Sequence, residues 1–233
     1  MSVQPMPWAG SCAGCTREDR PFCRGPQTIR DAFDRHGLPG SFPRGALLFN
    51  EGEPARGIFM ICEGRVKLTT TSAEGRTLIA RIAGPGDVLG ASASLLGMPY
   101  ETSAEVLESS HVTFLGRDSF LGMANAADAA LQIARELSAT YDAIQKDLRR
   151  MALAQTTTER LTSFLLDWCE RSGEPGPGGV RIHVGFTHEE LGQMIGTTRE
   201  TVTRILSALK RQNLVTVNGA TMYVDVKRLA LVS

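Results

Sequence analysis

Glycine-containing turns divide residues 41–116 into short apolar stretches, and this spacing restricts the fold more than any other feature. The stretches lie at 46–49, 58–61, 66–70, 78–82, 103–106 and 112–115. Turn signals at intervals of roughly 8–12 residues are typical of an all-β barrel or sandwich. The pattern therefore predicts a β-roll of about eight strands. With the helical segments that follow it, the expected fold class is α+β.

A helical segment with a regular seam of small and apolar residues follows at 120–154. The seam residues recur at alternating spacings of four and three: Met123, Ala127, Ala130, Ala134, Leu137, Tyr141, Ile144, Leu148 and Met151. A 3.5-residue period keeps one side of a helix facing a partner helix. We therefore expect a dimerisation helix that pairs with a second copy of the chain. The alternative is a helix packed on its own β-roll.

The C-terminal part begins with a helix expected over about 158–172, with Thr158 as its N-cap candidate. The loop SGEPGPGG at 172–179 ends that helix, and a short strand is expected at 180–184. Thr187 and Glu190 then form the pattern of a capping box.

Two short helices are predicted around a turn at Gly196, and Thr198 starts the second of them. The following sequence NLVTVNGATMYVDV is typical of a strand, an Asn-Gly hairpin and a strand. Two helices joined by a tight turn and followed by a hairpin predict a winged helix-turn-helix.

The second helix of this motif has an apolar side and a charged side. Its candidate DNA-binding residues are Arg199, Glu200, Thr203 and Arg204, with Lys210 and Arg211 at its end. Arginine offers a bidentate fork to guanine, glutamate accepts from the cytosine amino group, and threonine contacts a base or a methyl group. The two terminal cations are expected on phosphates. The alternative is a solvated helix with i,i+4 ion pairs such as Glu200–Arg204.

The four parts expected along the chain are a Cys-rich segment at 1–26, a β-roll sensor domain at 27–119, the dimerisation helix at 120–154 and the DNA-binding domain at 155–233. A short helix is expected at about 28–36.

The 25 basic and 25 acidic residues balance, so a nucleic-acid partner has to be met by a local patch. Without a secretory signal or a run of about 20 apolar residues, we expect a cytoplasmic protein with no membrane partner.

Together these parts resemble the CRP/FNR family of bacterial transcription regulators over nearly the whole chain. The matching stretches are PRGALLFNEGEP (43–54), EGRVKL (63–68), GPGDVLG (84–90), TTERLTSFL (157–165) and TTRETVTRIL (197–206). The resemblance implies a homodimer that binds a palindromic operator, with RNA polymerase as a further partner. It also implies that the residues matching Arg199, Glu200, Thr203 and Arg204 read base edges, in half-sites such as TGTGA or TTGAY.

The family's cyclic AMP cassette resembles G-E-L-G followed by an Arg-Ser pair. Here Ala91 stands at the glutamate position that would hold the ribose, and Thr102 stands at the arginine position that would hold the phosphate. A cyclic phosphate would meet Glu101 instead, which repels it. We therefore expect no cyclic AMP binding.

The family's iron–sulfur branch holds an oxygen-labile [4Fe–4S] cluster with N-terminal cysteines and one cysteine of the β-roll. This chain carries Cys12-x2-Cys15-x7-Cys23, and clustered thiolates suit Fe–S or zinc. The third spacing is longer than in the family, and the family's β-roll cysteine aligns with Thr113. The resemblance implies Cys12, Cys15 and Cys23 as metal ligands, and Cys62, the one cysteine within the predicted β-roll, is taken as the fourth. The alternatives are an inert core Cys62, zinc, a dithiol/disulfide switch, or a small-ligand sensor in the β-roll.

Catalysis is not expected from this sequence. Metal catalysis in a β-barrel needs converging imidazole and carboxylate ligands, and the histidines are scattered: His36, His111, His183 and His188. An interpretation from a different class is a redox or metal-binding module without sequence-specific DNA binding.

Overall fold

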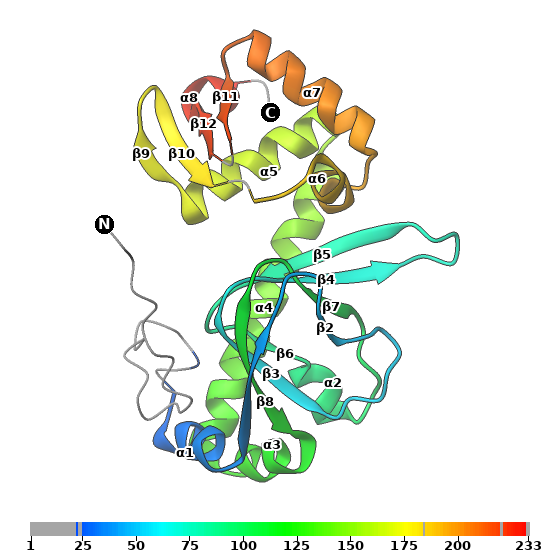
Figure 1. The fold of residues 1–233 in the computed structure, drawn as a ribbon, viewed down its shortest axis with the longest axis vertical. Coiled ribbons are helices and arrows are strands. Elements are labelled where there is room, and N and C mark those ends of the chain that lie inside the picture. The colour runs from blue at the N-terminus through cyan, green and yellow to red at the C-terminus, as the bar shows by residue number, and fades with distance from the viewer. Residues whose placement is uncertain (1–21, 23–24, 184, 220, 232–233) are drawn as a thin grey trace. The chain divides into compact units, whose positions relative to one another are not determined.

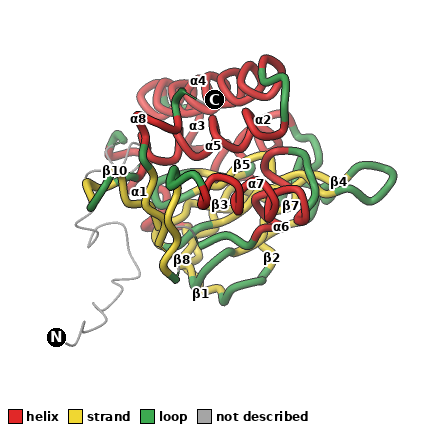
Figure 2. Tube along the Cα trace, turned by 90° about the horizontal axis from the view of Figure 1, so that it is seen from above, coloured by secondary structure: helices red, strands yellow, loops and turns green. Residues whose placement is uncertain are grey.

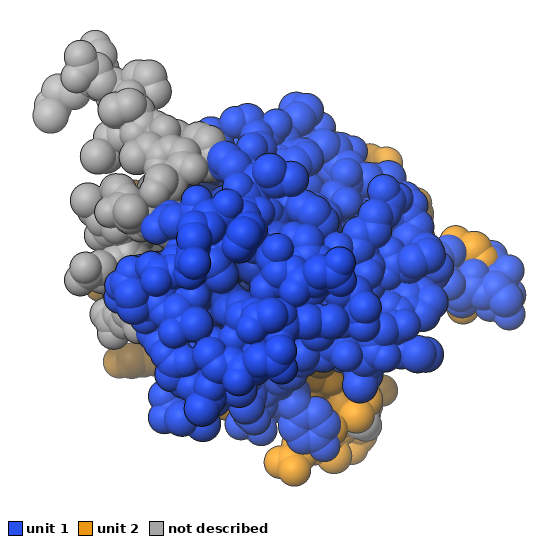
Figure 3. Space-filling view, turned by 90° about the horizontal axis from the view of Figure 1, so that it is seen from below, with its two compact units in different colours: residues 1–74, 80–142 blue, residues 75–79, 143–233 orange. Residues whose placement is uncertain are grey.

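The computed structural model describes residue 22 and residues 25–183, 185–219 and 221–231 (Figure 1). The chain divides into two compact units, which Figure 3 distinguishes by colour. Unit 1 comprises residues 1–74 and 80–142, and unit 2 comprises residues 75–79 and 143–233. None of the described helices is long and apolar enough to cross a membrane.

The predicted β-roll is present, and its strands form two four-stranded sheets (Figure 2, strands in yellow). The strands are β1 (Gly37–Phe42), β2 (Leu47–Phe49), β3 (Gly57–Glu63), β4 (Val66–Thr71), β5 (Thr77–Ala83), β6 (Val88–Leu89), β7 (Ser103–Val106) and β8 (Ser110–Gly116). Their orders are β1-β8-β3-β6 and β2-β7-β4-β5. The mixed helical and β architecture confirms the predicted fold class.

Two strands lie outside the stretches that the apolar pattern marks. β1 contains two glycines and Pro39, which is possible because it is an edge strand that pairs on one side, with β8. β6 has only two residues and pairs with β3 at Phe59 and Met60. Neither strand is long or apolar enough to produce a period-2 signal.

Alternation along β3 directs its side chains into two hydrophobic clusters. Ile61 belongs to a cluster with members from both sheets, among them Phe49 and Val66. Ile58 and Met60 belong to a second cluster, shared with helices α1 (Gln27–His36), α3 (Arg117–Ala124) and α4 (Ala127–Leu153). This second cluster, which we call the helix-side cluster, is completed by Phe22, Ile29, Ala32, Phe33, Leu115, Phe120, Met123, Ala129 and Ile133.

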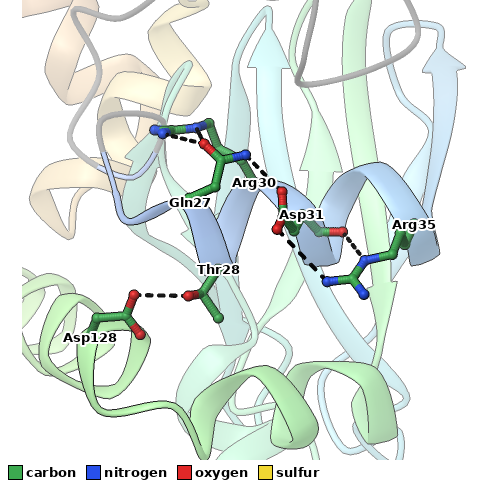
Figure 4. Close-up of polar contacts among 6 residues, drawn as sticks. All are labelled: Gln27, Thr28, Arg30, Asp31, Arg35 and Asp128. Carbon is green, nitrogen blue, oxygen red and sulfur yellow. Dashed lines mark hydrogen bonds and ion pairs between the residues drawn. The ribbon is translucent and has the colours of Figure 1, made fainter.

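Helix α1 is joined to α4 by a side-chain hydrogen bond as well as by this cluster (Figure 4). The Thr28 hydroxyl donates to the Asp128 carboxylate in the first turn of α4, at 2.8 Å. On α1 itself, Gln27 donates to Asp31 at 2.7 Å, and Arg35 lies 3.9 Å from the same carboxylate. The bounds of α1 confirm the helix expected at 28–36, with Gln27 as one more residue at its start.

The helical segment expected at 120–154 is two helices and not one. α3 ends at Ala124, and α4 begins at Ala127 after a break at Asn125 and Ala126. Phe120 and Met123 of α3 are buried in the helix-side cluster, so this part of the segment packs on its own unit. The long seam therefore belongs to α4 alone.

Helix α4 packs on the β-roll with one side only. Ala129 and Ile133 point into the helix-side cluster and the seam residue Leu137 packs against it, whereas three large seam residues that follow Leu137 are exposed within the chain. Tyr141, Ile144 and Leu148 are 61%, 53% and 58% exposed. The alternative of a helix packed on its own β-roll therefore holds for the first part of α4, and the later seam residues are left exposed in the single chain.

Unit 2 has the predicted winged helix-turn-helix layout. Its elements are α5 (Thr157–Ser172), β9 (Glu174–Gly176), β10 (Gly179–His183), α6 (His188–Ile195), α7 (Arg199–Arg211), β11 (Val215–Asn218), β12 (Thr221–Val224) and α8 (Val226–Leu229). One sheet joins the strands in the order β11-β12-β10-β9. The N-cap of α5 is Thr156, whose side chain accepts from the Glu159 N–H, and not Thr158, which lies inside the helix.

Candidate functional site

The two helices of the helix-turn-helix are fixed by caps that the sequence encodes. Thr187 and Glu190 form the predicted capping box of α6, and α6 ends at Gly196 in the left-handed conformation, with φ 68°. The turn passes close to Gly192, where a Cβ would lie 2.8 Å from the Thr197 carbonyl oxygen. Glycine is therefore needed at position 196, for its left-handed backbone, and at position 192, for the close approach of the turn. Thr198 caps α7 by accepting from the Thr201 N–H.

An arginine of α5 holds the turn from the other side. Arg160 donates to the Ile195 carbonyl oxygen at 2.9 Å and to the Thr157 hydroxyl at 3.2 Å. Because Ile195 is the last residue of α6, its carbonyl has no acceptor role inside the helix. The side chain of Arg160 thus satisfies a helix end and fixes the position of α6 against α5.

Helix α7 separates its apolar and polar residues as the sequence predicts. Val202, Ile205, Leu206 and Leu209 are buried. The exposed residues are Arg199, Glu200, Thr203, Arg204, Ser207, Lys210 and Arg211. All six candidate DNA-binding residues therefore lie on one solvent-facing side of a helix whose other side is core.

The charge at the start of α7 is set by local hydrogen bonds. The backbone N–H of Glu200 and the Thr198 hydroxyl lower the pKa of the Glu200 carboxyl below its ordinary value, and Arg199 adds to this. The carboxylate is therefore ionised at neutral pH and can only accept hydrogen bonds. That is the role required for contact with an amino group on a base edge.

One residue at this surface was missed by the sequence argument, which considers His188 only as one of four scattered histidines. His188 is half-buried, and its Nδ1 lies 2.8 Å from the Thr203 hydroxyl oxygen. Burial is the main cause that lowers its pKa below the ordinary value, and Lys210 and Arg199 contribute. The signal for this contact is three-dimensional, because the two residues are 15 positions apart on different helices.

In unit 1, the segment that corresponds to the cyclic AMP cassette carries an acidic side chain. Ala91 is the first residue of α2 (Ala91–Leu96), and Ser92 donates to the Glu101 carboxylate at 3.4 Å. The side chains of Ala91, Ser92 and Glu101 thus offer a methyl group, a hydroxyl and a carboxylate. None of these three is the cation that a phosphate prefers.

Of the four predicted metal ligands, the structure describes one. Cys12, Cys15 and Cys23 lie outside the described residues. Cys62 packs against the helix-side cluster on the same face of β3 as Ile58 and Met60, as predicted. Its Sγ lies 3.5 Å from the Thr113 hydroxyl oxygen.

The other described cysteine has a different environment. Cys169 on α5 is 6% exposed and belongs to the core. Burial raises the pKa of its thiol from 9.0 to about 11. A thiol with such a pKa stays protonated at neutral pH and is a poor nucleophile or ligand.

Comparisons with known proteins agree with this architecture. Residues 39–127 match the family model of the cyclic nucleotide-binding domain, and residues 159–232 match that of the Crp-like helix-turn-helix domain. The chain is 27% identical over 194 residues to the CRP-like cAMP-activated global transcriptional regulator of Mycobacterium tuberculosis, covering 82% of this chain and 86% of that protein. The chain belongs to the CRP/FNR family of transcription regulators.

Solved structures show the same fold. FixK2 from Bradyrhizobium japonicum has a TM-score of 0.72 at 23% identity, over 84% of this chain and 96% of that one. A CRP/FNR-family regulator from Thermus thermophilus has a TM-score of 0.67 at 24% identity, over 83% and 97% of the two chains. This CRP/FNR protein is a DNA-binding transcription regulator, and its curated relatives carry the names of regulators and not of enzymes.

Proposed function

We propose that this CRP/FNR protein acts as a homodimer that reads an inverted repeat with half-sites of the TGTGA or TTGAY kind. The observation that carries the proposal is helix α7, which buries four apolar side chains and exposes six candidate DNA contacts. A helix of this kind fits the major groove, where each base pair presents a distinct pattern of donors and acceptors.

The proposed roles follow from side-chain chemistry. Arg199 and Arg204 can each present two parallel N–H donors to a guanine, and the ionised Glu200 accepts from a cytosine amino group. Lys210 and Arg211, at the far end of α7, are assigned to phosphates. The chain as a whole is neutral, so this local group of cations has to supply the attraction to DNA.

The exposed seam of α4 supports the homodimer. Tyr141, Ile144 and Leu148 recur at the spacing that faces a second helix, and all three are exposed within one chain. Large apolar residues grouped on one side of a helix are costly to leave in water. Pairing with the same seam of a second copy covers them and places two recognition helices on a palindrome.

We further propose that Cys12, Cys15, Cys23 and Cys62 hold a [4Fe–4S] cluster that controls DNA binding. Two observations support it. Phe22, which directly precedes Cys23, is 2% exposed and belongs to the helix-side cluster against which Cys62 packs. Thr113, which aligns with the family's β-roll cysteine, lies 3.5 Å from the Cys62 sulfur, so Cys62 adjoins the expected ligand position.

The donor chemistry of these residues fits the group. Four thiolates are the usual ligand set of a [4Fe–4S] cluster, which supplies one-electron redox chemistry and sensitivity to oxygen when bound. The same thiolates suit zinc or a dithiol/disulfide switch, which are the alternatives for the signal. Cyclic AMP is not part of the proposal, because Ala91 and Thr102 stand at the cassette positions and the Glu101 carboxylate lies beside them.

The DNA-binding part is tested with Arg204→Ala on duplexes that carry the inverted repeat. We expect a loss of about 1–3 kcal/mol in binding free energy and a flattened preference at one base pair of the half-site. Lys210→Ala is the matched control, because loss of a phosphate contact weakens all sequences alike and reduces the salt dependence.

Fluorescence anisotropy at physiological salt gives both quantities. Equal weakening on every sequence would reduce Arg204 to a phosphate contact. An unaltered chain without sequence preference, under both oxidising and reducing conditions, would favour the metal-binding module that does not recognise DNA.

A further inference from the structure

A hydrogen bond connects the first helix of the helix-turn-helix to the exposed side of the second. His188 is the first residue of α6, and its Nδ1 lies 2.8 Å from the hydroxyl oxygen of Thr203 on α7. Thr203 is one of the candidate base-reading residues. The Thr203 hydroxyl is therefore already hydrogen-bonded within the protein in the absence of DNA.

The direction of this hydrogen bond follows from counting protons. The Thr203 hydroxyl also lies 2.9 Å from the Arg199 carbonyl oxygen, to which it donates. A hydroxyl has one proton and two lone pairs. Toward His188 the Thr203 oxygen must therefore accept, so that the imidazole carries its proton on Nδ1.

The charges around His188 are consistent with a neutral ring protonated on Nδ1. Arg199 and Lys210 of α7 face the imidazole, and with burial they keep its pKa low. On α6 itself, the Glu190 carboxylate is occupied by the capping box with Thr187, and Glu189 is exposed. Neutral imidazole has one donor nitrogen, and here that nitrogen faces Thr203.

These two hydrogen bonds leave the Thr203 hydroxyl with a lone pair and no proton to offer. In the major groove, adenine and cytosine present an amino donor, whereas guanine presents only the N7 and O6 acceptors. We propose that His188 is a positioning residue that fixes Thr203 as a hydrogen-bond acceptor and so makes one position of the half-site favour adenine or cytosine over guanine. The inference rests on the proposed reading of DNA by α7.

The test uses the full chain and a duplex with an inverted repeat of TGTGA, its half-site centres one helical turn apart, together with all symmetric single-base variants. In the unaltered chain we expect one position to prefer adenine or cytosine over guanine by roughly tenfold. His188→Ala removes the donor, and the preference at that position should fall to about twofold or less while the other positions keep theirs.

Two further variants separate positioning from a structural role. His188→Gln retains an N–H donor and should restore the preference, and Thr203→Val should abolish it without further loss in the double variant with His188→Ala. An unchanged preference in His188→Ala, or equal weakening on all duplexes, would overturn the inference. If the unaltered chain discriminates no sequence at all, the proposed DNA reading itself fails.

Discussion

Cys62 and Cys169 both lie on regular elements beside apolar residues, yet their surroundings differ. Cys169 is closed off in the core of unit 2, whereas Cys62 is half-buried beside a threonine hydroxyl. Cys169 lies next to Trp168 on the side of α5 that packs into its own unit. The environment of Cys62 depends on strand pairing between β3 and β8, which no local pattern reveals.

Burial should make Cys169 resistant to alkylation in the folded protein. Raising its pKa from 9.0 to about 11 lowers the thiolate fraction at pH 8 by roughly a hundredfold, and the thiolate is the reactive form. Because the folded pKa is above the unfolded one, the difference is present at pH 8 and decreases as the pH rises toward 11. Iodoacetamide labelling followed by peptide mass spectrometry, in buffer and in guanidinium, measures it. Equal rates in the two conditions would contradict the burial argument.

The caps of α6 and α7 are predicted residue by residue, because Thr187, Glu190 and Thr198 act within one turn of chain. The contact of His188 with Thr203 is not, because it requires the angle between two helices. Candidate DNA contacts are therefore available from sequence as a list of exposed side chains. Their hydrogen-bond roles require the structure.

At the scale of elements, helices and strands with a regular apolar spacing are predicted correctly, whereas those with a weak or interrupted spacing are missed. α7 and the seam of α4 follow from spacing alone, as does the Asn-Gly hairpin between β11 and β12. The break between α3 and α4 is missed because Met123 continues the apolar spacing although it packs on unit 1. β1 is missed because Pro39 and two glycines conceal an edge strand.

The seam of α4 leads to a prediction about assembly. Ile144→Glu places a charge at an exposed apolar position, which has little effect on the isolated chain but is unfavourable inside a helix pair. We expect the dimer dissociation constant to rise by about a hundredfold or more. Ala139→Glu is the matched control, because it makes the same charge change at an exposed position off the seam.

Sedimentation velocity across a concentration series distinguishes these variants. Ala139→Glu should sediment like the unaltered chain, and Ile144→Glu should shift to the monomer. If the unaltered chain is itself a monomer at every concentration, with or without DNA, the seam does not mediate dimerisation.

At the scale of the whole molecule, the order of parts is the most predictable property. A strand-rich region with regular turns, a helix with a seam and a capped helix pair each have a distinct period, and together they specify a CRP/FNR architecture. The signal is much less predictable, because it depends on which thiolates converge. Three of the four candidate ligands precede the continuously described part of the chain. For the fourth, Cys62, the structure gives contacts with Thr113 and Met60.

The last prediction concerns that convergence. Protein purified without oxygen should contain about four iron and four sulfide per chain, with a broad absorbance near roughly 400 nm. Single Cys→Ser changes at Cys12, Cys15, Cys23 and Cys62 should each reduce the iron content and weaken binding to the inverted repeat. Cys169→Ser is the matched control, because that thiol is buried in unit 2 and its pKa of about 11 keeps it protonated.

A colourless chain that carries zinc would exclude iron–sulfur control, and a metal-free chain that forms a disulfide would support the dithiol switch. Full iron content in Cys62→Ser would leave the cluster in place but remove Cys62 from it. In that case the contact between Cys62 and Thr113 is core packing, and the fourth ligand has to be sought elsewhere. If the chain keeps its DNA affinity after complete loss of iron, the cluster does not control DNA binding. Cluster binding and DNA binding would then be uncoupled functions of one chain.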